Sequence, residues 1–236
     1  MILMGYSIDG MWIRALVSRT VSDLRTRLRA VPTLTGTPPS WDPSQTPETP
    51  YQLFVEWLLA AIDRDVVEPC AATLSTVRAD GRPNARVLIL KNVTEDGWQF
   101  ASSSTSRKGE ELETTPYAAL TFYWIPLGRQ VRVSGRVVPA PAEESARDFL
   151  LRPPAARAEA LVGRQSAVLA DRADIDPAAQ EQADRIAADP ELIAPNWTLY
   201  TLRADEVEFW QADPDRRHLR LRYRLDENWT KELLWP

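Results

Sequence analysis

Hydrophobic residues recur with two different periods along the chain, and the change of period predicts where helices give way to strands. Apolar residues at three- and four-residue spacing predict helices over 17–31 and 51–65. The second helix presents a core-facing stripe made of Leu53, Phe54, Trp57, Leu58 and Ile62. Between these helices the run 32–50 contains six prolines, which predicts a linker crossing the surface.

From Ala71 to Val138, β-branched and apolar runs alternate with turn formers, which predicts strands joined by hairpins. Asp-Gly pairs at 80–81 and 96–97 mark two turns, and the segment 126–128 marks a third. A brief helix is expected over 106–115, and further helices over 141–152, 155–169 and 177–189. The tail from Trp197 is again strand-rich. Short antiparallel strands with inserted helices predict an α+β protein built on a barrel or a strongly curved sheet.

The proline-rich run also predicts the domain organisation. Residues 1–49 are expected to form an N-terminal helix and linker, and residues 50–236 a single domain. The first 30 residues begin apolar but lack a basic region, and Gly5, Asp9, Gly10 and Arg14 interrupt them. We therefore expect neither a signal peptide nor a membrane anchor.

Charge and cysteine content narrow the functional classes. The net charge of -5 and the pI near 5.1 provide no general positive field, which argues against binding to nucleic acid or to an anionic membrane. Cys70 is the single cysteine, so an intrachain disulfide is impossible and the usual Cys/His zinc patterns are absent. This cysteine usage fits a reducing cytoplasm.

The stretch EFWQADPDRRHLRLRY, residues 208–223, holds the one histidine of the chain among four arginines. If residues 216–223 are extended, alternate side chains share a face, and one face then carries Arg216, His218, Arg220 and Arg222. Such a row needs solvent, protein carboxylates or a bound anion to offset its repulsion. The neighbouring Trp210 favours a site, because an aromatic plane, forked donors and an imidazole suit a flat anionic heterocycle.

A second cationic cluster lies at the start of the expected helix over 106–115. Ser106 is a suitable N-cap, but Arg107 and Lys108 occupy the first turn, where positive charge opposes the helix dipole. A bound phosphate would reverse that effect, so this helix start is a candidate phosphate site. Arg86 and Lys91 lie at the two ends of a predicted apolar strand and on opposite faces, which by itself indicates two charges at the rim.

Taken in order, these segments resemble the pyridoxamine 5'-phosphate oxidase family of flavin mononucleotide (FMN) enzymes over residues 50–236. The most specific likeness is the C-terminal signature, which is present here as Glu208, Phe209, Trp210, Gln211, Arg216, His218 and Arg220. The resemblance implies an FMN-binding split β-barrel, an antiparallel Greek-key barrel with flanking helices. It also implies a homodimer with FMN bound at the subunit interface.

The same resemblance implies roles for individual residues. One copy would contribute to the FMN site Arg86, Val87, Leu88, Ile89, Leu90, Ala101, Ser102, Ser106, Arg107, Lys108 and Gln130. The other copy would contribute Gln165, Ser166, Trp210 and Arg220. The substrate phosphate would meet Lys91 and Arg152, while Arg216 and His218 would be the catalytic residues that face the substrate ring. No metal site is expected.

The implied reaction is oxidation of pyridoxamine or pyridoxine 5'-phosphate, with hydride transfer to flavin N5 and reoxidation by dioxygen. The chain departs from the family pattern at Asp148, Ala156, Arg217 and Leu219, and its ending LLWP lacks the arginine that is usual before the final leucine. Lys91 favours the phosphorylated substrate, whereas Asp148 favours another one, such as a dihydro-phenazine carboxylate. A non-catalytic protein that binds FMN or pyridoxal phosphate is a further alternative.

Overall fold

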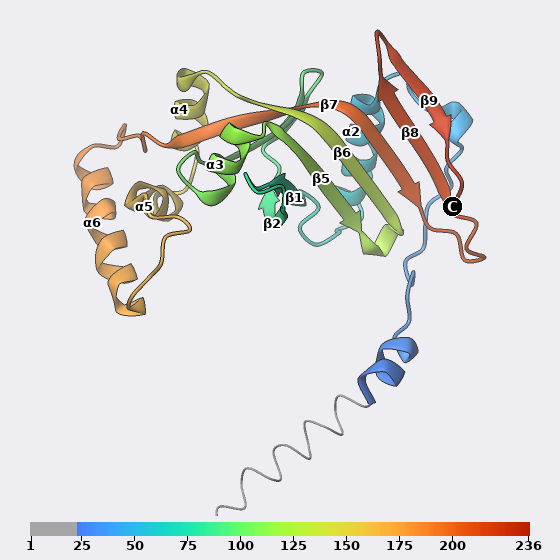
Figure 1. Cartoon of the computed structure of the whole chain (residues 1–236), viewed down its shortest axis with the longest axis horizontal. Coiled ribbons are helices and arrows are strands. Elements are labelled where there is room, and N and C mark those ends of the chain that lie inside the picture. The colour runs from blue at the N-terminus through green and yellow to red at the C-terminus, as the bar shows by residue number, and fades with distance from the viewer. Residues whose placement is uncertain (1–22) are drawn as a thin grey trace, which may run out of the picture. The chain divides into compact units, whose positions relative to one another are not determined.

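The computed structural model describes residues 23–236, and Figure 1 shows the arrangement of their elements. Residues 23–30 are helical and belong to the helix expected over 17–31. The first part of that helix, and residues 1–22 as a whole, lie outside the described residues. Two units are distinguished, the first ending at Thr35 and a compact second one formed by Gly36–Pro236. Within residues 23–236, no helix is long and apolar enough to cross a membrane.

The compact unit is built on one nine-stranded sheet in which every pairing is antiparallel. The main path runs β2-β1-β5-β6-β7-β4-β3, and β8 and β9 extend the sheet from β7. The strands are β1 (Ala71–Val77), β2 (Pro83–Ile89), β3 (Asn92–Thr94), β4 (Gly97–Ser103), β5 (Tyr117–Trp124), β6 (Arg129–Pro139), β7 (Trp197–Gln211), β8 (Leu219–Leu225) and β9 (Trp229–Leu233). The expected α+β class and antiparallel hairpins are confirmed.

Five helices pack around this sheet in the described chain. They are α2 (Pro50–Ile62), α3 (Arg107–Thr114), α4 (Ala142–Leu150), α5 (Pro154–Val162) and α6 (Ile175–Ala188), with short 3-10 turns η1 (Pro43–Gln45), η2 (Ile125–Leu127) and η3 (Arg172–Asp174). Figure 1 shows α4, α5 and α6 at the end of the sheet where β7 begins, and β8 and β9 at the end where β7 finishes. The long strand β7 therefore connects two separate regions of the unit.

The core forms where α2 packs against the sheet. Leu53, Phe54 and Trp57 are buried as expected, but Ile62 is 46% exposed and Ala61 takes the buried position instead. The helical period explains this correction: at roughly 100° per residue Ala61 lies about 20° from Phe54 around the helix, whereas Ile62 lies about 80° away. Phe54 packs edge-on against Trp98 and Phe122.

Two further segment boundaries differ from expectation. The helix expected over 155–169 ends at Val162, because Gly163 adopts a left-handed conformation with φ 69° that terminates it. The extended run after Pro83 is divided into β2 and β3 around Leu90 and Lys91. Lys91 thus lies at a break between strands, where its side chain is free to leave the plane of the sheet.

The proline-rich segment packs along the compact unit. Trp41 meets Trp57 edge-on at 4.9 Å between ring centroids. The side chain of Gln211 donates to the Pro39 carbonyl at 3.0 Å, and the Tyr223 hydroxyl donates to the Pro47 carbonyl at 2.8 Å. Prolines have no N–H to add to a sheet, so this segment is held through its carbonyls.

Candidate active site

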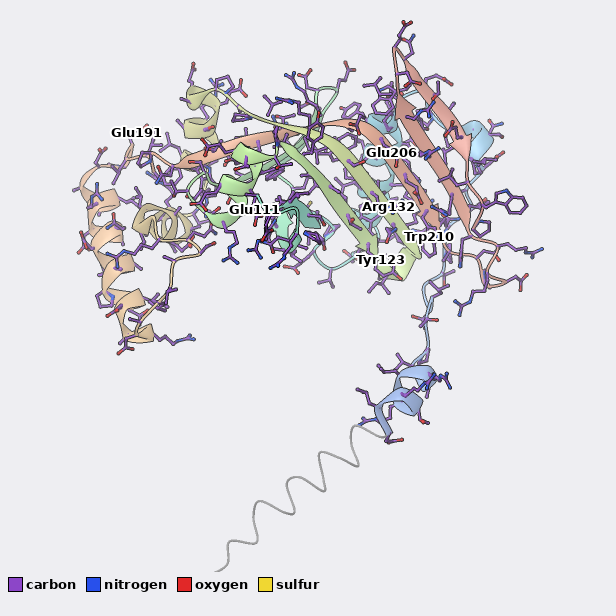
Figure 2. The ribbon with its side chains drawn as sticks, viewed as in Figure 1. Glu111, Tyr123, Arg132, Glu191, Glu206 and Trp210 are labelled. Atoms are coloured by element: carbon purple, nitrogen blue, oxygen red, sulfur yellow. The ribbon has the colours of Figure 1, made fainter. Side chains whose placement is uncertain are left out.

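One polar face of the sheet collects residues from β6, β7 and β8. Gln130 is paired directly with Trp210, and Trp210 with Arg220, so these three side chains form one row across three strands. On the other side of Gln130 lies Tyr123 of β5, so the row continues to a fourth strand, and Figure 2 labels both Tyr123 and Trp210. The alternate positions Val131, Phe209 and Leu221 are buried on the opposite face of the same strands. The register therefore places three predicted FMN ligands side by side in one chain, although the prediction assigns Gln130 to the FMN site of one copy and Trp210 and Arg220 to that of the other.

Glu208 anchors this face. It is 4% exposed, accepts a hydrogen bond from Arg220 Nε at 2.9 Å and also pairs with Arg132. Burial alone would raise the pKa of Glu208, but the bonds and charges of Arg220 and Arg132 outweigh it, so the pKa is lowered. The Trp235 carbonyl accepts from Arg220 Nη1 at 2.8 Å. Arg220 is therefore fixed in orientation.

Protein carboxylates offset part of the expected arginine row. Arg222 Nε donates to Glu232 at 3.0 Å, and Arg222 also pairs with Glu206. Together with Glu208 on Arg220, these contacts supply intramolecular anions for two of the four cationic positions. The remaining two positions, Arg216 and His218, differ from them in structure.

Arg216 and His218 lie in the loop before β8, which corrects the expectation of a strand from residue 216. β8 begins at Leu219, and Arg216 has a left-handed φ of 65° in the turn that follows Asp213. The Asp213 N–H donates to His218 Nδ1 at 3.1 Å, so a neutral imidazole carries its proton on Nε2. His218 packs against Trp210 with 4.9 Å between ring centroids.

The side chain of Arg216 is exposed and has no hydrogen-bond or ion-pair partner among residues 23–236. Its neighbour Arg217, by contrast, pairs with Asp215. The loop thus presents the Arg216 guanidinium, which has no partner among the described residues, and an oriented imidazole that packs against the Trp210 ring. This arrangement suits a planar anionic ligand.

The helix α3 carries a second group of the predicted FMN-binding residues. Ser106 caps it, accepting from the Gly109 N–H, and Lys108 Nζ donates to Ser106 Oγ at 3.3 Å and to Gln165 Oε1 at 3.1 Å. Ser102 Oγ also donates to Gln165 at 3.3 Å. Four of the predicted FMN-binding residues therefore meet within one chain. Which copy supplies Gln165 to a given FMN site stays a prediction.

The electrostatics at this helix fit an anion. Burial and the neighbouring Arg86 charge both lower the pKa of Lys108, while Glu159 and Glu111 oppose them. A phosphate at the α3 N-terminus would meet the Lys108 ammonium, the Ser106 hydroxyl and the free N–H groups of the first turn. These residues therefore fit the phosphate of FMN, and Arg107, which is exposed in the same turn, adds a further positive charge.

The strand β2 contributes Arg86 and an exposed apolar edge. Arg86 Nη2 bonds to Glu111 at 3.2 Å, and Glu111 also accepts from Thr76 and from Asn84 at 2.9 Å. Sequence reasoning gave Glu111 no role, because nothing in the helix pattern indicated that this acidic residue is buried. Val87 and Ile89 are 67% and 50% exposed on a strand that pairs only with β1.

The other predicted residues of this half differ in exposure. Leu88 and Ala101 are partly buried, and Leu90 is buried. Ser166 is exposed and adopts a left-handed φ of 71° in the loop after α5. In the sequence, Leu88 and Leu90 follow Arg86, Ala101 precedes Ser102, and Ser166 follows Gln165. Their contacts with FMN stay predictions.

A third cluster surrounds the first residue of β7. Lys91 Nζ lies 3.2 Å from Asp148 Oδ1, and the Trp197 Nε1–H donates to Asp148 Oδ2 at 2.8 Å. The Arg152 guanidinium stacks over the Trp197 ring at 3.8 Å, and its Nη1 is buried without a partner in the described chain. Both predicted substrate-phosphate ligands, Lys91 and Arg152, therefore lie in one place. Ala156, which follows in α5, offers no polar atom there.

The third cluster and the His218 loop lie at opposite ends of β7. Trp197 and Trp210 are thirteen residues apart in this strand, which corresponds to roughly 40 Å at the rise of an extended chain. Figure 1 shows the two ends of β7 on opposite sides of the unit. A single small-molecule site that uses both clusters must therefore take one from each of two copies of the chain.

Comparison with known proteins decides the family. Residues 58–185 match the model described as pyridoxamine 5'-phosphate oxidase, and residues 197–236 match the pyridoxine 5'-phosphate oxidase C-terminal dimerisation region. The chain belongs to the pyridoxamine 5'-phosphate oxidase family. It is 41% identical to the pyridoxine/pyridoxamine 5'-phosphate oxidase of Burkholderia multivorans, over 84% of this chain and 94% of that one. The corresponding protein of Ectopseudomonas mendocina is 42% identical, over 82% and 91%.

Two solved structures extend the comparison. PhzG from Burkholderia lata, solved with tetrahydrophenazine-1-carboxylic acid, has a TM-score of 0.79 and 33% identity, and covers 85% of this chain and 100% of its own. An FMN-binding protein from Nostoc punctiforme has a TM-score of 0.63 at 20% identity, over 80% and 98%, which bears on the fold alone. The oxidase is thus a homodimeric split-barrel flavoprotein with FMN as its cofactor, and these expectations are confirmed.

Replacing Lys108 with alanine is expected to weaken FMN binding by about tenfold, because one charge-assisted contact to the phosphate is lost. Titration of the apoprotein with FMN, followed by flavin fluorescence, measures the change. Arg147→Ala is the control, since this exposed arginine pairs only with Glu143 on α4 and its loss changes the net charge equally. Equal affinities for the two variants would show that Lys108 does not contact the cofactor.

Proposed function

We propose that this family member removes a hydride from an anionic nitrogen heterocycle, with pyridoxine or pyridoxamine 5'-phosphate as the first candidate substrate. One observation carries the proposal: the predicted substrate ligands form two cationic clusters, one at each end of β7. These ligands are Lys91 and Arg152 at one end, and Arg216 and His218 at the other. The curated relatives that share about two fifths of its residues bear the name of this activity, which supports the same choice. A cytoplasmic location is part of the proposal.

The chain's own residues would act by binding and orientation. Lys91 and Arg152 would hold the anionic group of the substrate, and Arg216 and His218 would align its ring from the other copy. The His218 Nε2–H would donate a hydrogen bond to a ring substituent, since Nδ1 is occupied by the Asp213 N–H. Arg216 would offset negative charge on the substrate. None of these residues is required as a nucleophile.

One copy would hold FMN through Ser106, Lys108 and Arg107 at the α3 N-terminus, with Arg86 nearby and with Gln130. The other copy would contribute Trp210 and Arg220 from its polar face. When bound, FMN would accept the hydride and pass the electrons to dioxygen, giving hydrogen peroxide. The polar row of β6, β7 and β8 would fix the ring system by hydrogen bonding and stacking, because Arg220 is already held by Glu208.

A second candidate substrate is a dihydro-phenazine carboxylate or a similar carboxylate. The ion pair of Asp148 with Lys91 favours it, since a carboxylate at this position opposes a phosphate. The likeness to PhzG, solved with a tetrahydrophenazine carboxylic acid, supports the same candidate.

Oxygen consumption by the FMN-loaded protein tests both candidates. We expect turnover with pyridoxine 5'-phosphate, pyridoxamine 5'-phosphate or a dihydro-phenazine carboxylate, with stoichiometric peroxide. Unphosphorylated pyridoxine is the control, because it lacks the anionic group. A yellow holoprotein that consumes no oxygen with any of these compounds would refute the proposal in favour of a non-catalytic binding role.

A further inference from the structure

The Asp148 carboxylate is held in place by two contacts on its two oxygens. Oδ1 lies 3.2 Å from Lys91 Nζ, and Oδ2 accepts the Trp197 Nε1–H at 2.8 Å. The side chain is 14% exposed, against 31% for Lys91. Because the indole fixes one oxygen, the other faces the Lys91 ammonium without rotating away into solvent.

Arg152 shares the same indole but has no such anion bonded to it. Its guanidinium lies over the Trp197 ring, and Nη1 is buried without a hydrogen-bond partner within residues 23–236. Burial lowers the pKa of Arg152, while the charges of Glu159 and Asp148 act in the opposite direction. A buried donor without an acceptor is costly, so an incoming ligand oxygen would stabilise this group.

The charge balance of this cluster discriminates between ligands. Lys91 and Arg152 supply two positive charges and Asp148 removes one, while Glu159 reduces the field at Arg152 further. A phosphate monoester carries roughly 1.5 to 2 negative charges at neutral pH, whereas a carboxylate carries one. The cluster matches the carboxylate, because the second charge of a phosphate would face Asp148.

We propose that Asp148 is a specificity-determining residue. Its ion pair with Lys91 lowers the affinity of this anion subsite for the dianionic phosphate and leaves Arg152 to bind a singly charged group. This inference rests on the proposed function, in which Lys91 and Arg152 receive the anionic end of the substrate. It adds which of the two candidate substrates this subsite favours: the second, because its anionic group is a monoanion, a carboxylate on a reduced nitrogen heterocycle.

Asp148→Asn tests the inference, because asparagine keeps the shape and an acceptor for the Trp197 N–H but removes the charge. For this variant we expect the KM for pyridoxine 5'-phosphate to fall about tenfold and kcat to stay within about twofold, since one repulsive charge near the phosphate is lost. The KM for a dihydro-phenazine carboxylate should fall much less. Glu143→Gln, which removes an exposed carboxylate from the same helix, should leave both KM values unchanged.

Binding to the FMN-loaded protein separates this inference from the proposed function. The probes are pyridoxal 5'-phosphate and phenazine-1-carboxylate, titrated against the flavin absorbance of wild type and variant. A selective gain of about tenfold for the phosphate supports the inference even if no compound is turned over. An unchanged affinity ratio, or equal changes for both probes, overturns it even if turnover is observed. Thermal unfolding confirms that both variants are folded.

Discussion

The Arg216→Ala variant is expected to lose about 100-fold to 1000-fold in kcat/KM while its FMN dissociation constant stays within about twofold. Arg216 is exposed in the loop before β8 and has no partner among the described residues, so its guanidinium is available to the substrate. The groups that fix the polar face, Glu208 and Arg220, bond to one another without it. Steady-state oxygen consumption and flavin titration measure the two quantities separately.

Arg217→Ala is the matched control for that variant. Arg217 is adjacent in the chain, 77% exposed and paired with Asp215, so its loss changes the net charge equally. We expect kcat/KM for Arg217→Ala to remain within about twofold of wild type, as is usual for an exposed ion pair. If the Arg216 variant instead lost FMN but kept its turnover per bound flavin, the assigned role would be wrong, and Arg216 would be a cofactor ligand.

Glu208→Gln is expected to lower the free energy of unfolding by about 3 kcal/mol, near the lower end for breaking a buried ion pair. Glu208 is buried between Arg132 and Arg220, but Arg132 is 49% exposed and can turn to solvent after the change. FMN affinity should fall as well, because Arg220 loses the bond that orients it. Denaturant unfolding of the apoprotein and flavin titration provide the two measurements.

The pH dependence gives a second test of Glu208. Folding lowers the pKa of Glu208 from its ordinary value of 4.5. The ionised carboxylate therefore stabilises the folded protein above the ordinary glutamate pKa, and this stabilisation is lost as the pH falls through the lowered pKa. The stability difference between wild type and Glu208→Gln should therefore shrink below about pH 4.5. Glu206→Gln is the control: its side chain is 37% exposed, and a loss below about 1 kcal/mol is expected. Equal losses of unfolding free energy in both variants would show that the buried ion pairs of Glu208 stabilise the fold no more than an exposed pair does.

Local sequence patterns predicted most of the elements correctly. The Asp-Gly pair at 80–81 lies between β1 and β2, and the pair at 96–97 lies at the turn from β3 to β4. Ser106 caps α3, as its position indicated. These features depend on residues a few positions apart, so they can be read from a short window. The errors occurred where backbone conformation changed within a run: Gly163 ended α5 early, and the left-handed Arg216 delayed the start of β8.

The roles of Glu111 and Glu208, which the sequence pattern did not indicate, have a different explanation. Glu111 on α3 and Glu208 on β7 are buried carboxylates, and their partners Arg86, Arg132 and Arg220 come from other elements. An acidic residue in a window of sequence gives no sign of burial, because exposed and buried carboxylates occur in the same local patterns. Strand register places Glu208 opposite Arg132, and the packing of α3 against β1 brings Glu111 to Arg86, so these roles followed only from the tertiary structure.

The sequence by itself determined the family, the cofactor and the set of cationic residues, because the spacing of Glu208, Trp210, Arg216, His218 and Arg220 lies within one short segment. How those charges are paired could be seen only in the folded chain. It placed Asp148 on Lys91, fifty-seven residues away in the chain, and it separated Trp197 from Trp210 at the two ends of β7. The physical reason is that a pairing of distant residues depends on strand register and helix packing, which no local pattern encodes.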